Sequence, residues 1–122
     1  MSALDFWLKP LAEGEPRSSL VEAGELSIRV ERHDGESFLA LYGELDVASA
    51  PLLDRELNRA IASTPTIVVD LSALEFIDSN GIRSLLSASR IKGRDVCYLR
   101  PPPDVARILQ MVGADECLRY LD

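Results

Sequence analysis

The strongest constraint on the fold is a short apolar run in the middle of the chain, Thr66-Ile67-Val68-Val69. Its residues are β-branched or apolar at even and odd positions alike, so both faces of an extended segment would be apolar. A strand with one face in water would instead alternate apolar and polar residues. We therefore predict a central strand that is covered on both faces, with Asp70 at its carboxyl end.

An antiparallel hairpin is predicted before this strand. Between Leu26 and Glu31, apolar residues alternate with polar ones, which is typical of a half-buried strand. Residues 33–36 then contain Gly35 and predict a turn, and a second apolar extended segment follows at residues 38–42. These two segments are expected to pair with each other.

Three amphipathic helices are predicted after the hairpin. The first has Pro51 in its first turn, and its buried stripe consists of Leu53, Leu57, Ala60 and Ile61. The second follows Asp78 and ends at Gly93; it buries Ile82, Leu85, Leu86 and Ser89, and turns Arg83, Ser84, Ser87 and Arg90 to water. The third follows residues 101–103, ends at Gly113 and buries Val105, Ile108, Leu109 and Val112. A buried strand at residues 96–99 separates the last two helices, and residues 118–121 are a candidate for a final short strand.

Strands that alternate with helices after an opening hairpin predict an α/β domain. Its sheet should be mixed, because the hairpin is antiparallel and the helical crossovers connect parallel strands. A chain of 122 residues with 47% hydrophobic content can close one core of ordinary size. Residues 1–24 are rich in proline, glycine and scattered charge and predict an N-terminal arm outside the core, so the domain is expected at residues 25–122.

The composition excludes several classes of function. Thirteen basic and twenty acidic residues give a formal charge of −7, the wrong sign for direct binding of nucleic acid. No apolar run approaches the roughly 20 residues that span a bilayer, and the start has no signal-peptide pattern, so a cytoplasmic protein without a membrane segment is expected. Cys97 and Cys117, with a single histidine, fit no metal-ligand spacing, so we predict reduced thiols, no metal and no cofactor.

The tetrapeptide Asp78-Ser79-Asn80-Gly81 is the candidate functional site. It lies where a helix is predicted to begin, and backbone N–H groups without partners in the helix favour an anion there. Asp78 or Ser79 could cap the helix, and the missing Cβ of Gly81 would let a kinase approach the Ser79 hydroxyl. Phosphate on Ser79 would add about −1.5 to −2 charges beside Asp78. The alternative, that these residues only cap a helix, stays open at this point.

Catalysis by this chain is not expected. A nucleophilic Ser79 would need a base, but His33 is the only histidine and lies in a predicted turn, and no Gly-x-Ser-x-Gly pattern surrounds the serine. The sequence also contains neither of the glycine-rich patterns that bind nucleotide phosphates. Any ATP would therefore belong to a partner.

Three stretches in register, residues 43–46 (Gly-Glu-Leu-Asp), 69–72 (Val-Asp-Leu-Ser) and 76–82 (Phe-Ile-Asp-Ser-Asn-Gly-Ile), resemble the STAS family of sulphate-transporter and anti-sigma-factor-antagonist domains. The resemblance covers residues 26–121 and implies a STAS-type mixed sheet covered by α-helices. It implies that Ser79 is phosphorylated by an anti-sigma factor serine kinase and is reset by a serine phosphatase. The unphosphorylated protein would bind the anti-sigma factor and release the sigma factor.

The resemblance also implies a partner-binding face. The loop with Glu44 and Asp46 would lie beside the helix of Ser79, and the expected partner-binding residues are Glu44, Asp46, Asp78, Ser79, Asn80, Gly81 and Arg83. Purely structural roles stay open for two loop residues, since Asp46 could cap the first helix and Leu45 could pack in the core.

Two departures from the family pattern are visible. Position 80 is Asn, where the family more often has Ser or Thr, which could alter recognition by the kinase. The sequence also stops at Asp122, where relatives commonly continue into a further helix, so Leu4, Phe6, Trp7 and Leu8 are expected to pack on the sheet, within the same chain or across a homodimer. The alternative function is a non-phosphorylated STAS scaffold, or an accessory subunit of a stress-signalling or lipid transport complex.

Overall fold

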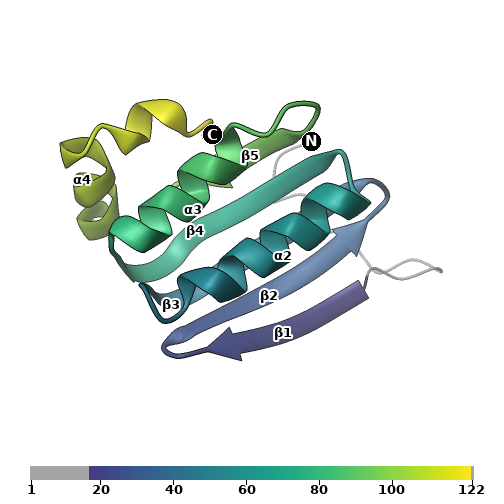
Figure 1. Cartoon of the computed structure of the whole chain (residues 1–122), viewed down its shortest axis with the longest axis horizontal. Coiled ribbons are helices and arrows are strands. Elements are labelled where there is room, and N and C mark those ends of the chain that lie inside the picture. The colour runs from purple at the N-terminus through teal and green to yellow at the C-terminus, as the bar shows by residue number, and fades with distance from the viewer. Residues whose placement is uncertain (1–16, 122) are drawn as a thin grey trace.

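The computed structural model describes residues 17–121 of the chain, so the N-terminal apolar residues Leu4, Phe6, Trp7 and Leu8 lie outside the described residues. Five strands form one sheet in the order β1-β2-β3-β4-β5 (Figure 1). They are β1 (Arg17–Ala23), β2 (Leu26–His33), β3 (Glu36–Leu45), β4 (Thr66–Ile77) and β5 (Asp95–Leu99). The first three strands pair antiparallel, and β3–β4 and β4–β5 pair parallel. The predicted mixed α/β sheet is therefore confirmed.

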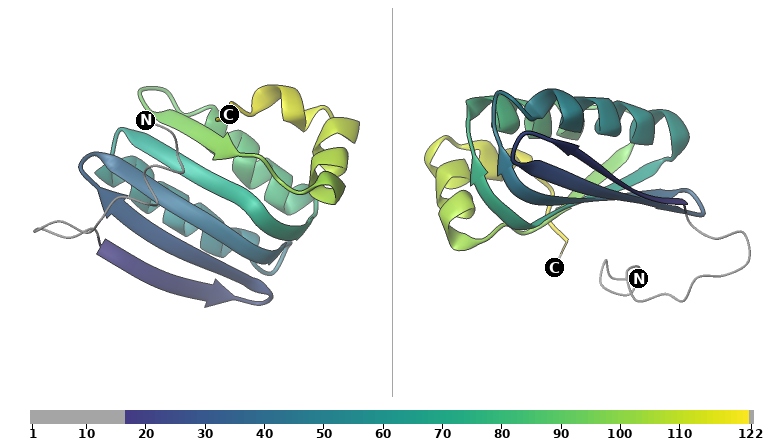
Figure 2. Two further views of the ribbon diagram at one scale, coloured as in Figure 1. Left: turned by 180° about the vertical axis from the view of Figure 1, so that it is seen from behind. Right: turned by 90° about the horizontal axis from the view of Figure 1, so that it is seen from below.

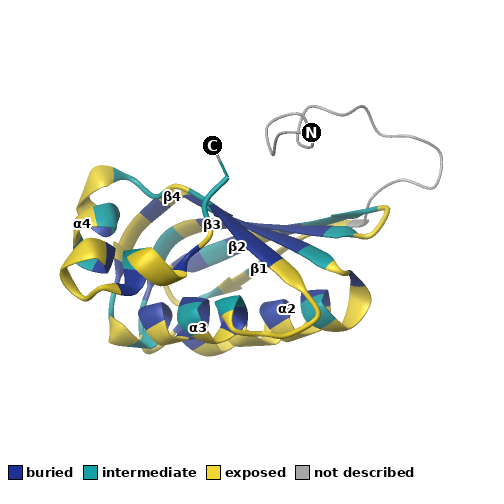
Figure 3. Cartoon of the chain, turned by 90° about the horizontal axis from the view of Figure 1, so that it is seen from above, coloured by how far each residue is buried: buried dark blue, intermediate teal, exposed yellow. Residues whose placement is uncertain are grey.

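Two helices supply the parallel crossovers. Helix α2 (Ala50–Ser63) connects β3 to β4, and α3 (Ser79–Ser89) connects β4 to β5. They lie side by side on one face of the sheet (Figures 1 and 3). Helix α4 (Pro103–Met111) lies at one end of the sheet, and the short 3₁₀ helix η1 (Ala114–Cys117) follows it. Within residues 17–121, no helix is both long and apolar enough to cross a bilayer.

The main core lies between the sheet and helices α2 and α3. Its helix-facing strand residues are Leu26, Ile28, Val30, Leu39, Leu41, Ile67, Val69, Val96 and Tyr98. The predicted buried stripe of α2 is confirmed by Leu53, Leu57 and Ala60. On α3 the predicted burial of Ile82 and Leu85 is also confirmed.

Two predicted helix faces are wrong at single positions. Ser84 of α3 was expected to face water, yet its exposed fraction is 4%. It lines a small pocket together with Leu57 and Asn58, because α2 packs along that side of α3. Val112 was expected to be buried, but α4 ends at Met111, so Val112 follows the last helical turn and is exposed.

The predicted boundary of the N-terminal arm is wrong for its last part. Residues 17–23 form the edge strand β1, which pairs along its whole length with β2, from Arg17 opposite Arg32 to Ala23 opposite Leu26. Val21 and Ala23 pack partly against the main core. An edge strand shares hydrogen bonds with one neighbour and buries few side chains, so β1 lacks the regular apolar pattern of an inner strand. The proline and glycine residues around it therefore indicated an arm outside the core.

The central strand is longer than predicted. β4 continues past Asp70 to Ile77, so Asp70 lies within the strand and not at its end. A register shift against β3 occurs at this point, and the Asp70 carboxylate accepts a hydrogen bond from the Ser72 N–H (2.9 Å). The segment at residues 118–121 makes one isolated bridge from Tyr120 to Tyr98, so the candidate final strand is reduced to a single pairing.

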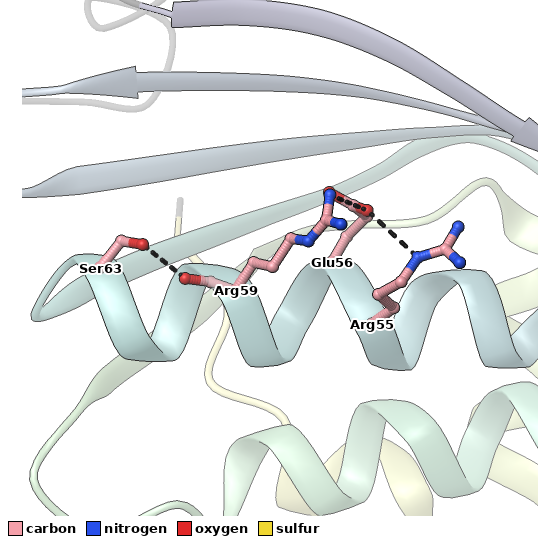
Figure 4. Close-up of polar contacts among 4 residues, drawn as sticks. All are labelled: Arg55, Glu56, Arg59 and Ser63. Atoms are coloured by element: carbon pink, nitrogen blue, oxygen red, sulfur yellow. Dashed lines mark hydrogen bonds and ion pairs between the residues drawn. The ribbon is translucent and has the colours of Figure 1, made fainter.

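A buried carboxylate interrupts the apolar side of α2. The exposed fraction of Glu56 is 3%, and its Oε2 lies 3.4 Å from Arg59 Nη1 and 3.8 Å from Arg55 Nε. Figure 4 shows both arginines, which are exposed to water themselves, reaching this carboxylate, while the Ser63 hydroxyl donates to the Arg59 carbonyl (2.7 Å). The pairing offsets the cost of removing a charged group from water.

Candidate functional site

Asp78 fixes the start of α3. Its backbone is extended, and its Oδ1 accepts hydrogen bonds from the N–H groups of Asn80 (2.8 Å) and Gly81 (3.2 Å). These are two of the donors that a helix leaves unpaired at its first turn. The capping role predicted for Asp78 is thus present, and Ser79 becomes the first residue of the helix.

The same residue ties the loop after β3 to the start of α3. The Asp78 N–H donates to the carbonyl of Leu45 (3.1 Å), and the second carboxylate oxygen, Oδ2, accepts from the N–H of Val47 (3.2 Å). The carboxyl ends of the parallel strands β3 and β4 meet at one edge of the sheet, so their following segments lie together. Asp46, Val47 and the start of the Ser79 helix therefore lie side by side.

The loop between β3 and α2 is held by its own polar groups. Asp46 Oδ1 accepts from the N–H groups of Ala48 and Ser49, each at 3.1 Å. The Ser49 hydroxyl lies 3.0 Å from both Asp46 Oδ1 and the Glu44 carbonyl oxygen. The structural role that remained open for Asp46 is therefore present, and Leu45 packs in the main core.

Gly43 of the first motif also has a structural role. Its φ is +96°, a conformation that favours glycine, and a Cβ there would clash with the Glu25 carbonyl oxygen. That carbonyl accepts a hydrogen bond from the Glu44 N–H (2.9 Å). Glycine thus lets the turn between β1 and β2 approach the end of β3.

The interpretation of Gly81 as an opening toward Ser79 is wrong. Gly81 is buried, and the side where a Cβ would be attached faces Leu45 and Ile77 of the core. Glycine at this position lets the first turn of α3 approach the ends of β3 and β4. The structure thus gives Gly81 a packing role.

Three of the predicted site residues lie at the surface on the first turns of α3. Ser79 and Arg83 are exposed, and Asn80 is partly exposed. Arg83 Nη2 donates to Asn80 Oδ1 at 2.6 Å, so the asparagine at the unusual position holds the arginine in place. The chain can therefore present a serine hydroxyl, an amide and a guanidinium to a partner.

A groove between α2 and α3 adjoins this surface. Its volume is about 580 Å³, and its lining includes Val47, Pro51, Asp54, Asn80 and Arg83. Sequence reasoning missed Val47, whose exposed fraction is 68%. The available signal was an apolar residue directly after the polar loop residue Asp46. Among residues 17–121, no group of three or more His, Cys, Asp or Glu side chains is placed to hold a metal ion.

The α/β domain thus places an exposed serine, at the first position of a capped helix, beside an exposed apolar residue and a groove. A family model described as "Mlab, STAS domain" matches residues 28–120. The anti-sigma-F factor antagonist RsfB of Mycobacterium tuberculosis is 30% identical over 97 residues, which cover 77% of this chain and 80% of that protein. An anti-sigma F factor antagonist of Paenibacillus polymyxa is 34% identical over 104 residues, which cover 80% of this chain and 87% of that protein. The chain belongs to the STAS domain family.

A solved structure agrees with this assignment. The crystal structure of an anti-sigma factor antagonist from Mycobacterium paratuberculosis superposes with a TM-score of 0.65 at 25% sequence identity. The similarity covers 91% of this chain and 89% of that one. The resemblance to the STAS family predicted from the motifs is thus confirmed.

Proposed function

We propose that this chain is an anti-sigma factor antagonist that switches partners through Ser79. Its unphosphorylated form binds an anti-sigma factor that has serine kinase activity. This binding frees the sigma factor from the anti-sigma factor. The observation that carries the proposal is the exposed Ser79 at the first position of α3, in a chain that is 30% and 34% identical to two proteins named as such antagonists.

The switch consists of one phosphoryl transfer. The γ-phosphoryl group of ATP bound to the kinase moves to Ser79 Oγ; the bond to ADP breaks, and the hydroxyl proton passes to a base of the kinase. A serine phosphatase restores the hydroxyl by hydrolysis. The chain itself supplies the acceptor and needs no cofactor.

A phosphate on Ser79 should leave the domain folded but should weaken a complex in which a partner covers Ser79. At the N-terminus of α3, the helix dipole partly stabilises the added −1.5 to −2 charges, so the domain should stay folded. Asp78, however, already places a carboxylate beside Ser79, and burying two adjacent anionic groups under a partner is costly. Phosphorylation should therefore weaken binding through the interface.

The partner-binding surface is proposed to comprise Ser79, Asn80 and Arg83 on α3, with Glu44 near the end of β3 and Val47 on the loop that follows it. Val47 is the exposed apolar residue that a partner could cover, and Arg83 offers a charge held in place by Asn80. Asp46 and Asp78 act through loop and helix geometry, since their carboxylates accept backbone hydrogen bonds.

The test is a binding titration with the purified anti-sigma-type kinase in the absence of ATP. We expect the native chain and Ser79→Ala to bind, and Ser79→Asp and a chain with phosphoserine incorporated at position 79 to bind at least about tenfold more weakly. Ser19→Asp is the matched control, because Ser19 is an exposed serine on the edge strand β1. Equal weakening by Ser19→Asp, or none by Ser79→Asp, would contradict the proposal.

A second candidate is a STAS scaffold or transport accessory subunit that is not phosphorylated on Ser79. It is favoured by the description of the matching family model, "Mlab, STAS domain", and by Asn80 in place of the more usual hydroxyl residue. Binding to a partner complex that is indifferent to Ser79→Asp and to phosphoserine would support this candidate.

A further inference from the structure

The sheet has a second apolar cluster on the face opposite α2 and α3. It consists of Phe38, Val68 and Cys97, which we call the back-face cluster. The three residues are cross-strand neighbours, since Phe38 pairs with Val68 and Val68 pairs with Cys97. Because side chains alternate along a strand, these residues project away from the main core that α2 and α3 cover. Figure 2 shows this face from behind the helices.

The burial of the back-face cluster requires a cover over the whole row. The exposed fractions of Phe38, Val68 and Cys97 are 0%, 5% and 2%. Among residues 17–121, Leu99 and Leu121 are the partly buried apolar residues packed against the cluster. Both lie on its β5 side, whereas Phe38 is in β3. Phe38, at the other end of the row, is nevertheless covered as completely as Cys97.

We propose that the apolar segment at residues 4–8 of the same chain packs on the back-face cluster. The segment contains Leu4, Phe6, Trp7 and Leu8, a dense apolar group that would form an exposed patch if left in water. Aromatic side chains also bury the largest apolar areas, which suits a flat sheet face lined by Phe38. The segment thereby completes a second core layer on the sheet.

The chain between residue 8 and strand β1 is long enough for residues 4–8 to reach the back-face cluster. The cross-strand row that contains the back-face cluster begins at Ser18 on β1 and continues through Glu31 of β2 to Phe38, Val68 and Cys97. With strands about 4.8 Å apart, Val68 lies roughly 14 Å from Ser18 across the sheet. Residues 9–16 can span up to about 26 Å when extended. A short tether also gives a high effective concentration, which favours docking within one chain over docking on a second copy.

Cys97 probes this cover by comparison between variants, because the packing of Leu99 and Leu121 on the β5 side is common to all of them. The full-length Cys117→Ser chain removes the exposed thiol and leaves Cys97, whose pKa is raised by burial. Iodoacetamide reacts with the thiolate, so alkylation of Cys97 should be slow in the folded chain. Phe6→Ser with Trp7→Ser should accelerate it by about tenfold or more, and the exposed control Leu20→Ser on β1 should not. Circular dichroism and a urea titration verify that each variant is folded.

A second readout needs no substitution, because Trp7 is the only tryptophan. Its fluorescence should resist quenching by acrylamide in the folded chain and become fully quenchable in urea. Protection of Cys97 and Trp7 that persists across a wide dilution series supports docking within one chain. Protection that is lost on dilution would assign the cover to a second copy and overturn the proposal. Free quenching of Trp7 in the folded chain would also overturn it.

Discussion

Replacing Gly81 with alanine tests how α3 is seated on the ends of β3 and β4. An added Cβ would lie 2.6 Å from Leu45 Cγ and 2.9 Å from Ile77 Cγ1, well inside normal contact distance. Both neighbours are fully buried and cannot rotate into solvent. Overpacking of this kind costs about 1–3 kcal/mol, while alanine gains about 0.5–1 kcal/mol over glycine within a helix. The clash should win, with a net loss of about 1–2 kcal/mol.

Urea unfolding measures this difference in the free energy of unfolding. With a denaturant slope of about 1–3 kcal/mol per molar, the midpoint of Gly81→Ala should fall by roughly 1 M. The matched control is Ser87→Ala, which changes an exposed residue of the same helix and should shift stability by less than about 0.5 kcal/mol. A Gly81→Ala chain as stable as the native protein, or more stable, would refute the packing role.

Three further changes test the site and the core. Asp78→Ala removes the acceptor of two helix N–H groups and should lower the free energy of unfolding by about 1–2 kcal/mol in a urea titration, whereas Asp78→Asn should lose less. Tyr98→Phe removes a buried hydroxyl that donates to the Leu85 carbonyl (2.8 Å) and should cost about 1 kcal/mol. Because burial raises the pKa of Tyr98 above its ordinary 10.0, the unfolded chain loses this proton first, so native stability should fall above about pH 10, and less steeply in Tyr98→Phe. Val47→Thr should weaken partner binding by about tenfold in a titration with the anti-sigma-type kinase, while the remote exposed control Leu20→Ala should not.

The central elements were predictable because their side chains repeat with the period of the structure. The alternation around Ile28 identified β2, and the apolar stripe at Leu53 and Leu57 identified α2. The continuation of β4 past Asp70 was hidden because polar residues interrupt the apolar pattern where the strand shifts register. Edge strand β1 was hidden for a related reason, since exposed residues such as Ser19 dominate it.

The location of the candidate site was predictable from the sequence, but the roles of its individual residues were less so. The sequence placed Ser79 at the start of a helix and indicated that Asp78 could cap it. It could not show that Gly81 faces the core, because that depends on how closely α3 approaches Leu45. The exposure of Val47 likewise depends on a loop conformation set by hydrogen bonds between segments distant in sequence.

The phosphorylation state of Ser79 is the most direct test of the central claim. The purified chain would be incubated with ATP and the anti-sigma-type serine kinase, and its intact mass would be measured together with that of Ser79→Ala. We predict one phosphate on the native chain, none on Ser79→Ala, and release of the phosphorylated chain from the kinase. Equal phosphorylation of Ser79→Ala, or a stable complex with the kinase in which Ser79 stays unmodified, would contradict the account.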